Sequence, residues 1–172
     1  PALVALAGFL GLTYLYCQGR ILLASTGIPA WREPAILPLI ISTGLCEGSG
    51  LLLLTMHVVG IANDNGWVLF LFLAFLAFRT FAWSKYRENL NASKTPAKTL
   101  SILNSIHAQI LWGSNIAPLV LLLAAMFLSA QTTLLSSIAA VLTVAGGWYM
   151  KFVIVARASQ VQGYSLGKLQ KG

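Results

Sequence analysis

The sequence contains few charged residues. Asp, Glu, Lys and Arg make up 9% of its 172 residues, and only four residues are acidic. Hydrophobic residues make up 58%, and the mean hydropathy is +0.80. So few polar residues cannot cover the core of a soluble domain of this length. The composition therefore excludes a water-soluble globular domain and predicts an integral membrane protein.

Cysteine is also scarce. Cys17 and Cys46 both lie in apolar stretches, where we expect small buried side chains. An iron–sulfur cluster usually takes four cysteine ligands, so this chain cannot hold one alone and any cluster must belong to a partner. The sequence opens at Pro1 directly on an apolar stretch, without the basic region of a signal peptide, and we expect further residues upstream.

Five long apolar stretches are the dominant pattern. Each approaches or exceeds the ~20 residues that a helix needs to cross ~30 Å of hydrocarbon. They predict an all-α fold, a polytopic transmembrane helix bundle that forms one domain over residues 1–172. The expected helices are 1–23, 35–60, 66–84, 101–129 and 132–156, with a basic loop at 85–100 and a basic C-terminal tail at 157–172.

The positive charges all fall on one side when these helices alternate in direction. The loops around residues 63–65 and 129–131, on the other side, contain no Lys or Arg. The positive-inside rule then predicts cytoplasmic basic loops and a cytoplasmic C-terminus. Because the charges gather at helix ends, we expect no nucleic-acid partner. The cations are Arg20, Arg32, Arg79, Lys85, Arg87, Lys94, Lys98, Lys151, Arg157, Lys168 and Lys171.

Glu47 is the most informative single residue because it lies near the middle of the second helix. A carboxylate there costs several kcal/mol if it is ionised and unpaired, so its side chain should face protein or water. It is a candidate for proton handling, and a neutral acid bonded to a neighbouring helix fits equally well. Gly44, Gly48 and Gly50 nearby would let another helix approach closely.

The fourth helix has a polar face. Asn104, His107, Ser114 and Asn115 recur at roughly helical spacing, and such a face should point into the bundle. His107 is a candidate for binding a quinone carbonyl, and a structural hydrogen bond is the alternative. Pro118 lacks a backbone donor, so it should bend the helix and free the carbonyl of Ser114.

The two histidines lie at different depths. His57 is near the far end of the second helix and His107 is near the basic end of the fourth, which separates them by roughly 24 Å along the membrane normal. They cannot both ligate one haem, so we expect no haem in this chain.

The first basic turn is the most distinctive segment. Tyr14, Tyr16 and Arg20 precede a proline-rich link that carries Trp31 at interfacial depth. We interpret this segment as a docking surface. An ordinary interfacial loop with aromatic and basic anchors is the alternative.

The segment YLYCQGRILLASTGIPAWREP and the helix after it resemble the membrane anchor subunits of dimethyl sulfoxide reductase-type molybdoenzymes, within the polysulfide reductase and NrfD-like group. The shared elements are Arg20 at a helix end, the Pro29-Ala30-Trp31 element and a following helix rich in small residues. The last stretch, GGWYMKFVIVARASQVQGYSLG, resembles the closing helix, and GIPAWREP is closest to the phenylacetyl-CoA:acceptor oxidoreductase branch. Such anchors typically have eight helices, so the likeness aligns this chain with the last five.

This resemblance implies a subunit of a bacterial or archaeal inner membrane that binds menaquinone or ubiquinone and exchanges electrons with a ferredoxin-like iron–sulfur subunit. On this resemblance, the candidates for the rim of the quinone pocket or for docking are Tyr14, Tyr16, Arg20 and Trp31. Substrate chemistry would take place in a separate molybdopterin subunit. The family's quinone-site residues lie largely in earlier helices, so Glu47, His57 and His107 do not inherit those roles. Two other functions remain open from the residues alone: a small transporter or channel with Glu47 in its pathway, and a b-type cytochrome anchor.

Overall fold

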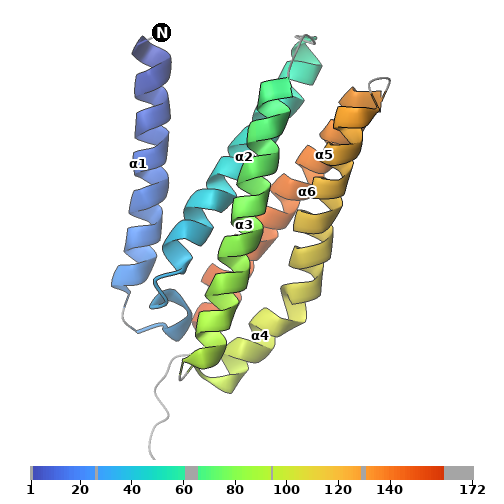
Figure 1. Cartoon of the computed structure of the whole chain (residues 1–172). Coiled ribbons are helices and arrows are strands. Elements are labelled where there is room, and N and C mark those ends of the chain that lie inside the picture. The colour runs from blue at the N-terminus through green and yellow to red at the C-terminus, as the bar shows by residue number, and fades with distance from the viewer. Residues whose placement is uncertain (1, 26, 61–65, 94, 129–130, 161–172) are drawn as a thin grey trace, which may run out of the picture.

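The computed structural model describes residues 2–25, 27–60, 66–93, 95–128 and 131–160. Every element in these ranges is helical, and five helical spans are long and apolar enough to cross a membrane, which confirms the predicted fold class. The spans are α1 (Ala2–Ala24), α2 (Ile36–Val59), α3 (Gly66–Ala92), the α4–η2–α5 span (Ala97–Phe127) and the α6–η4 span (Thr132–Arg157) (Figure 1).

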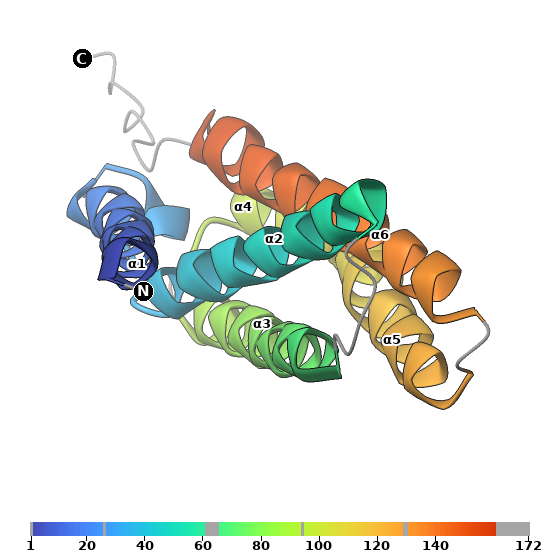
Figure 2. The ribbon, with the colours of Figure 1, turned by 90° about the horizontal axis from the view of Figure 1, so that it is seen from above.

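Helix α2 is the centre of the bundle. It packs against α3, α6 (Thr132–Phe152) and α1, and α5 (Ala117–Phe127) packs against α6. Seen from above, α2 lies between α3 and α6, while α1 stands beside the first half of α2 (Figure 2). The end of the bundle where α1 ends and α2 begins carries exposed Arg20, Arg32 and Lys85, and we call it the basic end.

The buried apolar side chains form two clusters, one above the other. The cluster at the basic end gathers around Ile36, Trp83 and Tyr86, and the cluster toward the opposite end gathers around Leu53 and Phe72. Along each of the four inner spans, buried polar residues occur between the residues of these two clusters. The bundle therefore has a polar layer between two apolar cores.

Helix α1 is loosely attached. Gly19 is its only buried residue, and the first half of α1 diverges from the other helices (Figure 1). Gly19 lies on Leu37 and Leu15 lies on Gly44, and near the end of α1 Leu22 and Leu23 pack against the cluster at the basic end. Gly50 in turn lies against Ala140 and Val144, so two of the three glycines expected to admit a neighbouring helix do so. Gly48 instead faces an apolar groove of about 480 Å³ between α1, α2 and α3.

The predicted basic loop at 85–100 is wrong in its extent. Helix α3 continues to Ala92 and α4 (Ala97–Ala108) begins five residues later, so most of this segment is helical. The reason is that α3 remains buried beyond the expected membrane boundary, through Tyr86 and Leu90. The Tyr86 hydroxyl donates to the carbonyl of Ala30, 2.8 Å away, in the short η1 helix (Pro29–Trp31).

Replacing Tyr86 by Phe is expected to lower the free energy of unfolding by about 1–2 kcal/mol, because the buried carbonyl of Ala30 loses its donor. Tyr149→Phe is the matched control, since the exposed Tyr149 side chain makes no hydrogen bond among the described residues. Unfolding by SDS titration of mixed micelles measures both. Equal losses in the two variants would contradict this role for Tyr86.

The fourth span bends as expected. Helix α4 runs at an angle to α5, and a π-helix, η2 (Gln109–Ile116), joins them immediately before Pro118 (Figure 1). A proline has no N–H to donate to the carbonyl four residues earlier, and π-helical turns and prolines are both recognised causes of kinks. The freed carbonyl belongs to Ser114.

Candidate functional site

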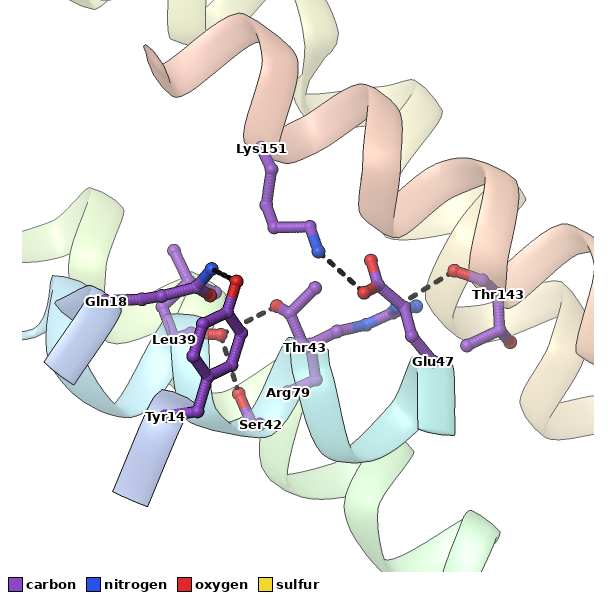
Figure 3. A network of polar contacts seen from close by, with 9 residues as sticks. All are labelled: Tyr14, Gln18, Leu39, Ser42, Thr43, Glu47, Arg79, Thr143 and Lys151. Atoms are coloured by element: carbon purple, nitrogen blue, oxygen red, sulfur yellow. Dashed lines mark hydrogen bonds and ion pairs between the residues drawn. The ribbon is translucent and has the colours of Figure 1, made fainter. Parts of the chain in front are cut away.

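Six polar residues from four spans meet between the two apolar cores, and we call them the polar layer. All but one are at most 8% exposed, and the exception, Lys151, is half-buried. Figure 3 shows Glu47, Arg79, Thr143 and Lys151 of this group. The six are Glu47 of α2, Arg79 of α3, Ser114 and Asn115 of η2, and Thr143 and Lys151 of α6.

Arg79 holds three spans together. Its Nε donates to Asn115 Oδ1 (2.8 Å) and its Nη1 to the carbonyl oxygen of Thr143 (3.2 Å). Its Nη2 donates to the carbonyl oxygen of Ser114 and to Ser114 Oγ. The side chain is 1% exposed, and every one of these acceptors is a neutral oxygen. A buried guanidinium needs such partners because an unpaired one would be expensive in the bilayer.

The backbone of η2 supplies the key acceptor. Pro118 leaves the carbonyl of Ser114 without its ordinary helical donor, and the Arg79 guanidinium takes that place. Asn115 steadies the arrangement because its Nδ2 donates to the carbonyl of Ile110, 3.0 Å away, while its Oδ1 accepts from Arg79. The sequence predicted that the Ser114 carbonyl would be freed, and the structure shows that the donor comes from another helix.

Glu47 and Lys151 form an ion pair across the α2–α6 interface. Lys151 Nζ lies 2.6 Å from Glu47 Oε2, and the two side chains are 31% and 10% exposed. The other carboxylate oxygen, Oε1, has no hydrogen-bond partner among the described residues. The hydroxyl of Thr43, one turn away, donates to the carbonyl of Leu39 instead (2.6 Å). Glu47 therefore has one oxygen in an ion pair and one buried oxygen that accepts no hydrogen bond from the described residues.

Glycines on α6 allow this close approach. A Cβ at Gly147 would lie 2.5 Å from Glu47 Oε1 and 3.2 Å from Thr43 Cγ2, and a Cβ at Gly146 would collide with the Ser114 side chain. The Gly146-Gly147 pair thus brings α6 against both α2 and η2.

Replacing Gly147 by Ala is expected to destabilise the protein by about 1–3 kcal/mol, because the added methyl group must displace the Glu47 carboxylate or part the helices. Gly48→Ala is the matched control: a Cβ there meets no atom within 4 Å, and alanine favours the helix by ~0.5–1 kcal/mol. In SDS unfolding, the free energy of unfolding of Gly48→Ala should equal or exceed that of the unmodified protein, and that of Gly147→Ala should be lower. The reverse order would argue against tight packing at Gly147.

An opening of about 240 Å³ lies beside the polar layer, between α1, α2 and the α6–η4 span. Lys151 belongs to both, because its ammonium pairs with Glu47 while the side chain lines the opening. Gln18 is the other polar residue there, and its Nε2 donates to the Tyr14 hydroxyl (2.8 Å). The remaining lining residues are aliphatic: Ile21, Leu22, Ile40 and Val155.

The size and depth of this opening limit what it can hold. Drug-sized ligands occupy ~300–1,000 Å³, so this space suits a single ring with small polar substituents. Gln18 lies roughly 9 Å from the end of α1, which places the opening near the basic end.

The sequence-predicted candidates are dispersed. Tyr14, Tyr16 and Arg20 are exposed on α1, and none of the three lines the opening, although the Tyr14 hydroxyl accepts a hydrogen bond from Gln18, which does. Trp31 is half-buried, and its Nε1 donates to the carbonyl of Ile154 (3.1 Å), so it ties η1 to the end of the α6–η4 span. This fixed position does not fit a free docking side chain.

The histidines have separate protein partners. Trp83 Nε1 donates to His107 Nδ1 (3.2 Å) and the two rings stack, while His57 Nδ1 lies 2.8 Å from Ser137 Oγ at the opposite end of the bundle. His107 is thus outside the polar layer. Glu47 is the one predicted candidate that belongs to it.

Two cations of the site were expected elsewhere. Arg79 and Lys151 were assigned to the basic end, and the structure corrects this: both lie in the polar layer. The reason for Arg79 is the full length of α3, whose 27 residues put this position near the helix centre. Lys94 and residues 161–172 of the expected tail lie outside the described residues.

The described residues contain no group of three or more His, Cys, Asp and Glu side chains that could hold a metal ion. Comparison with protein-family models, with curated protein sequences and with solved structures finds no match.

Proposed function

We propose that the chain is the membrane anchor of an oxidoreductase complex and that it binds the ring of a quinone or quinol in the opening beside Lys151. One observation carries the proposal. Two polar side chains, Gln18 and Lys151, line an opening whose other lining residues are aliphatic. Quinone oxygens accept hydrogen bonds, whereas the ring and the isoprenoid tail are apolar. A pocket with a few placed donors among apolar walls suits such a ligand.

The position of the opening agrees with an electron-transfer role. It is near the basic end, where a ferredoxin-like iron–sulfur subunit would dock and exchange electrons with the ring. Exposed cations such as Arg20, Arg32 and Lys98 suit an acidic partner surface there. In this proposal the molybdopterin subunit carries out the substrate chemistry, the ligand is menaquinone or ubiquinone, and the basic end is cytoplasmic.

Two measurements on one preparation test this function. The complex is purified from native membranes through a tag on this chain, its molybdenum and iron are quantified, and it is photolabelled with an azidoquinone. We expect both metals to co-purify and the label to map to peptides containing Gln18 or Lys151. A metal-free preparation would contradict the anchor role, and a label confined to other helices would contradict the site.

A transporter is the second candidate, favoured by the three ionisable side chains of the polar layer inside an apolar bundle. It predicts solute movement into liposomes that contain the chain without redox subunits. A b-type cytochrome anchor predicts a haem band in reduced-minus-oxidised spectra, and the separate partners of His57 and His107 do not favour it.

A further inference from the structure

We infer that Lys151 is the proton-exchange group of the quinone site, and that Glu47 and Arg79 are its fixed counter-charges. This inference rests on the proposed quinone site. Lys151 was expected at the basic end. The structure places its side chain between the buried Glu47 carboxylate and the opening.

The charges of the polar layer do not balance when all its ionisable groups are charged. With all three groups ionised, Arg79 and Lys151 oppose one carboxylate, so the polar layer carries one net positive charge. The hydrogen bonds of Arg79 go to neutral oxygens, and its guanidinium lies within electrostatic range of the Glu47 carboxylate. Arginine does not release its proton in proteins. If Lys151 gives up one proton, Glu47 and Arg79 remain as a balanced pair.

This balance matters because net charge inside a bilayer is costly. Loss of a proton from Lys151 removes the excess charge, whereas protonation of Glu47 would raise the net charge to two. Loss of a proton from Arg79 would also balance the layer, but arginine keeps its proton in proteins. Of the three groups, Lys151 is therefore the one that can change its charge and leave the layer neutral.

Lys151 is also the most accessible of the three groups. The Lys151 side chain is 31% exposed and lines the opening, whereas Glu47 and Arg79 are buried. The Glu47 carboxylate is packed against Gly147 inside the bundle, so Lys151 is the member of the ion pair that a ligand in the opening can meet.

Among the residues that the structure describes, few other titratable groups lie on the elements around Lys151. Helix α1 presents Tyr14, which is bonded to Gln18, and α2 presents buried Cys46 beside Glu47. Ser114 and Asn115 of η2 are neutral, and Arg157 of η4 lies over the Phe152 ring.

Reduction of a quinone to a quinol takes two electrons and two protons. An iron–sulfur cluster of the partner subunit would supply the electrons, one at a time. The Lys151 ammonium gives one proton to one ring oxygen and becomes an amine, and solvent at the basic end supplies the proton for the other ring oxygen. A second proton from solvent then restores the ammonium, so both protons of the quinol come from solvent in the net balance. Quinol oxidation runs in the reverse direction.

The test uses the whole purified complex, with a reduced viologen dye as the electron source and a short-chain quinone as the acceptor. Lys151→Arg keeps the charge but cannot release a proton, so we expect quinone affinity within about threefold of the unmodified complex and turnover lower by about 100-fold. Thr55→Ser, an equally conservative change at an exposed position toward the opposite end of α2, is the control and should keep full turnover.

Lys151→Ala provides a second measurement. Added methylammonium should raise its turnover at least about tenfold, because a small amine can replace the missing group, and added guanidinium should not. Unchanged turnover in Lys151→Arg, or no rescue of Lys151→Ala by the amine, would overturn the inference. If the unmodified complex binds no quinone analogue and takes no azidoquinone label, it is the proposed function that fails.

Discussion

Replacing Arg79 by Met is expected to lower the free energy of unfolding by roughly 2–4 kcal/mol. The four hydrogen bonds of its guanidinium would be lost, each at ~0.6–1 kcal/mol inside a membrane, and the acceptors on η2 and α6 would be left without donors. Glu47 would also lose one of its two nearby cations. These losses should exceed the gain from burying an apolar side chain of similar length.

Arg79→Lys separates geometry from charge. A lysine keeps the positive charge but lacks the planar fork that reaches Asn115, Ser114 and Thr143 together, so we expect an intermediate loss. Arg157→Met is the matched control, because Arg157 is exposed and lies over the Phe152 ring. SDS unfolding in mixed micelles measures all three variants. An Arg79→Met protein as stable as Arg157→Met would show that the guanidinium does not hold the spans together.

The second large effect is expected at the Glu47–Lys151 ion pair. Glu47→Leu leaves the ammonium and the Arg79 guanidinium without a counter-charge, so it should cost about 3 kcal/mol. Lys151→Met should cost less, because Glu47 keeps Arg79 nearby. The double variant should lose less unfolding free energy than the sum of the two single variants. We expect this difference, the coupling energy, to be about 1–2 kcal/mol, which allows for the partial exposure of Lys151.

A double-mutant cycle on unfolding free energies measures this coupling. The Lys85–Glu88 pair is the control, because both side chains are at least half exposed and their coupling should stay below about 1 kcal/mol. Additive losses at Glu47 and Lys151 would show that the two side chains stabilise the bundle independently.

The sequence allowed the fold to be predicted because long apolar stretches have one physical solution in a bilayer. The five spans differ from the expected ranges by a few residues, except where α3 continues to Ala92. That end was missed because the polar residues after Trp83 suggested a loop. The segment is helical because Tyr86 and Leu90 are buried on that side of α3, a contact between parts of the chain far apart in sequence.

The site was only partly predictable. Glu47 stood out because a lone carboxyl in an apolar helix needs a partner, and Pro118 identified the carbonyl of Ser114. The partners themselves could not be inferred. Arg79 and Lys151 each lie within two or three turns of an expected helix end, where a cation ordinarily reaches the interface. Their inward direction depends on helix rotation and on the close approach at Gly146 and Gly147, which the sequence does not show.

The loose attachment of α1 has a consequence for biogenesis. In the two-stage view, helices insert individually and associate afterwards. The four inner spans contain both apolar cores and the polar layer, so we expect them to assemble first as a stable unit. Helix α1 would dock last, through the contacts at Gly19 and Gly44, and its arrival would complete the wall of the opening at Gln18.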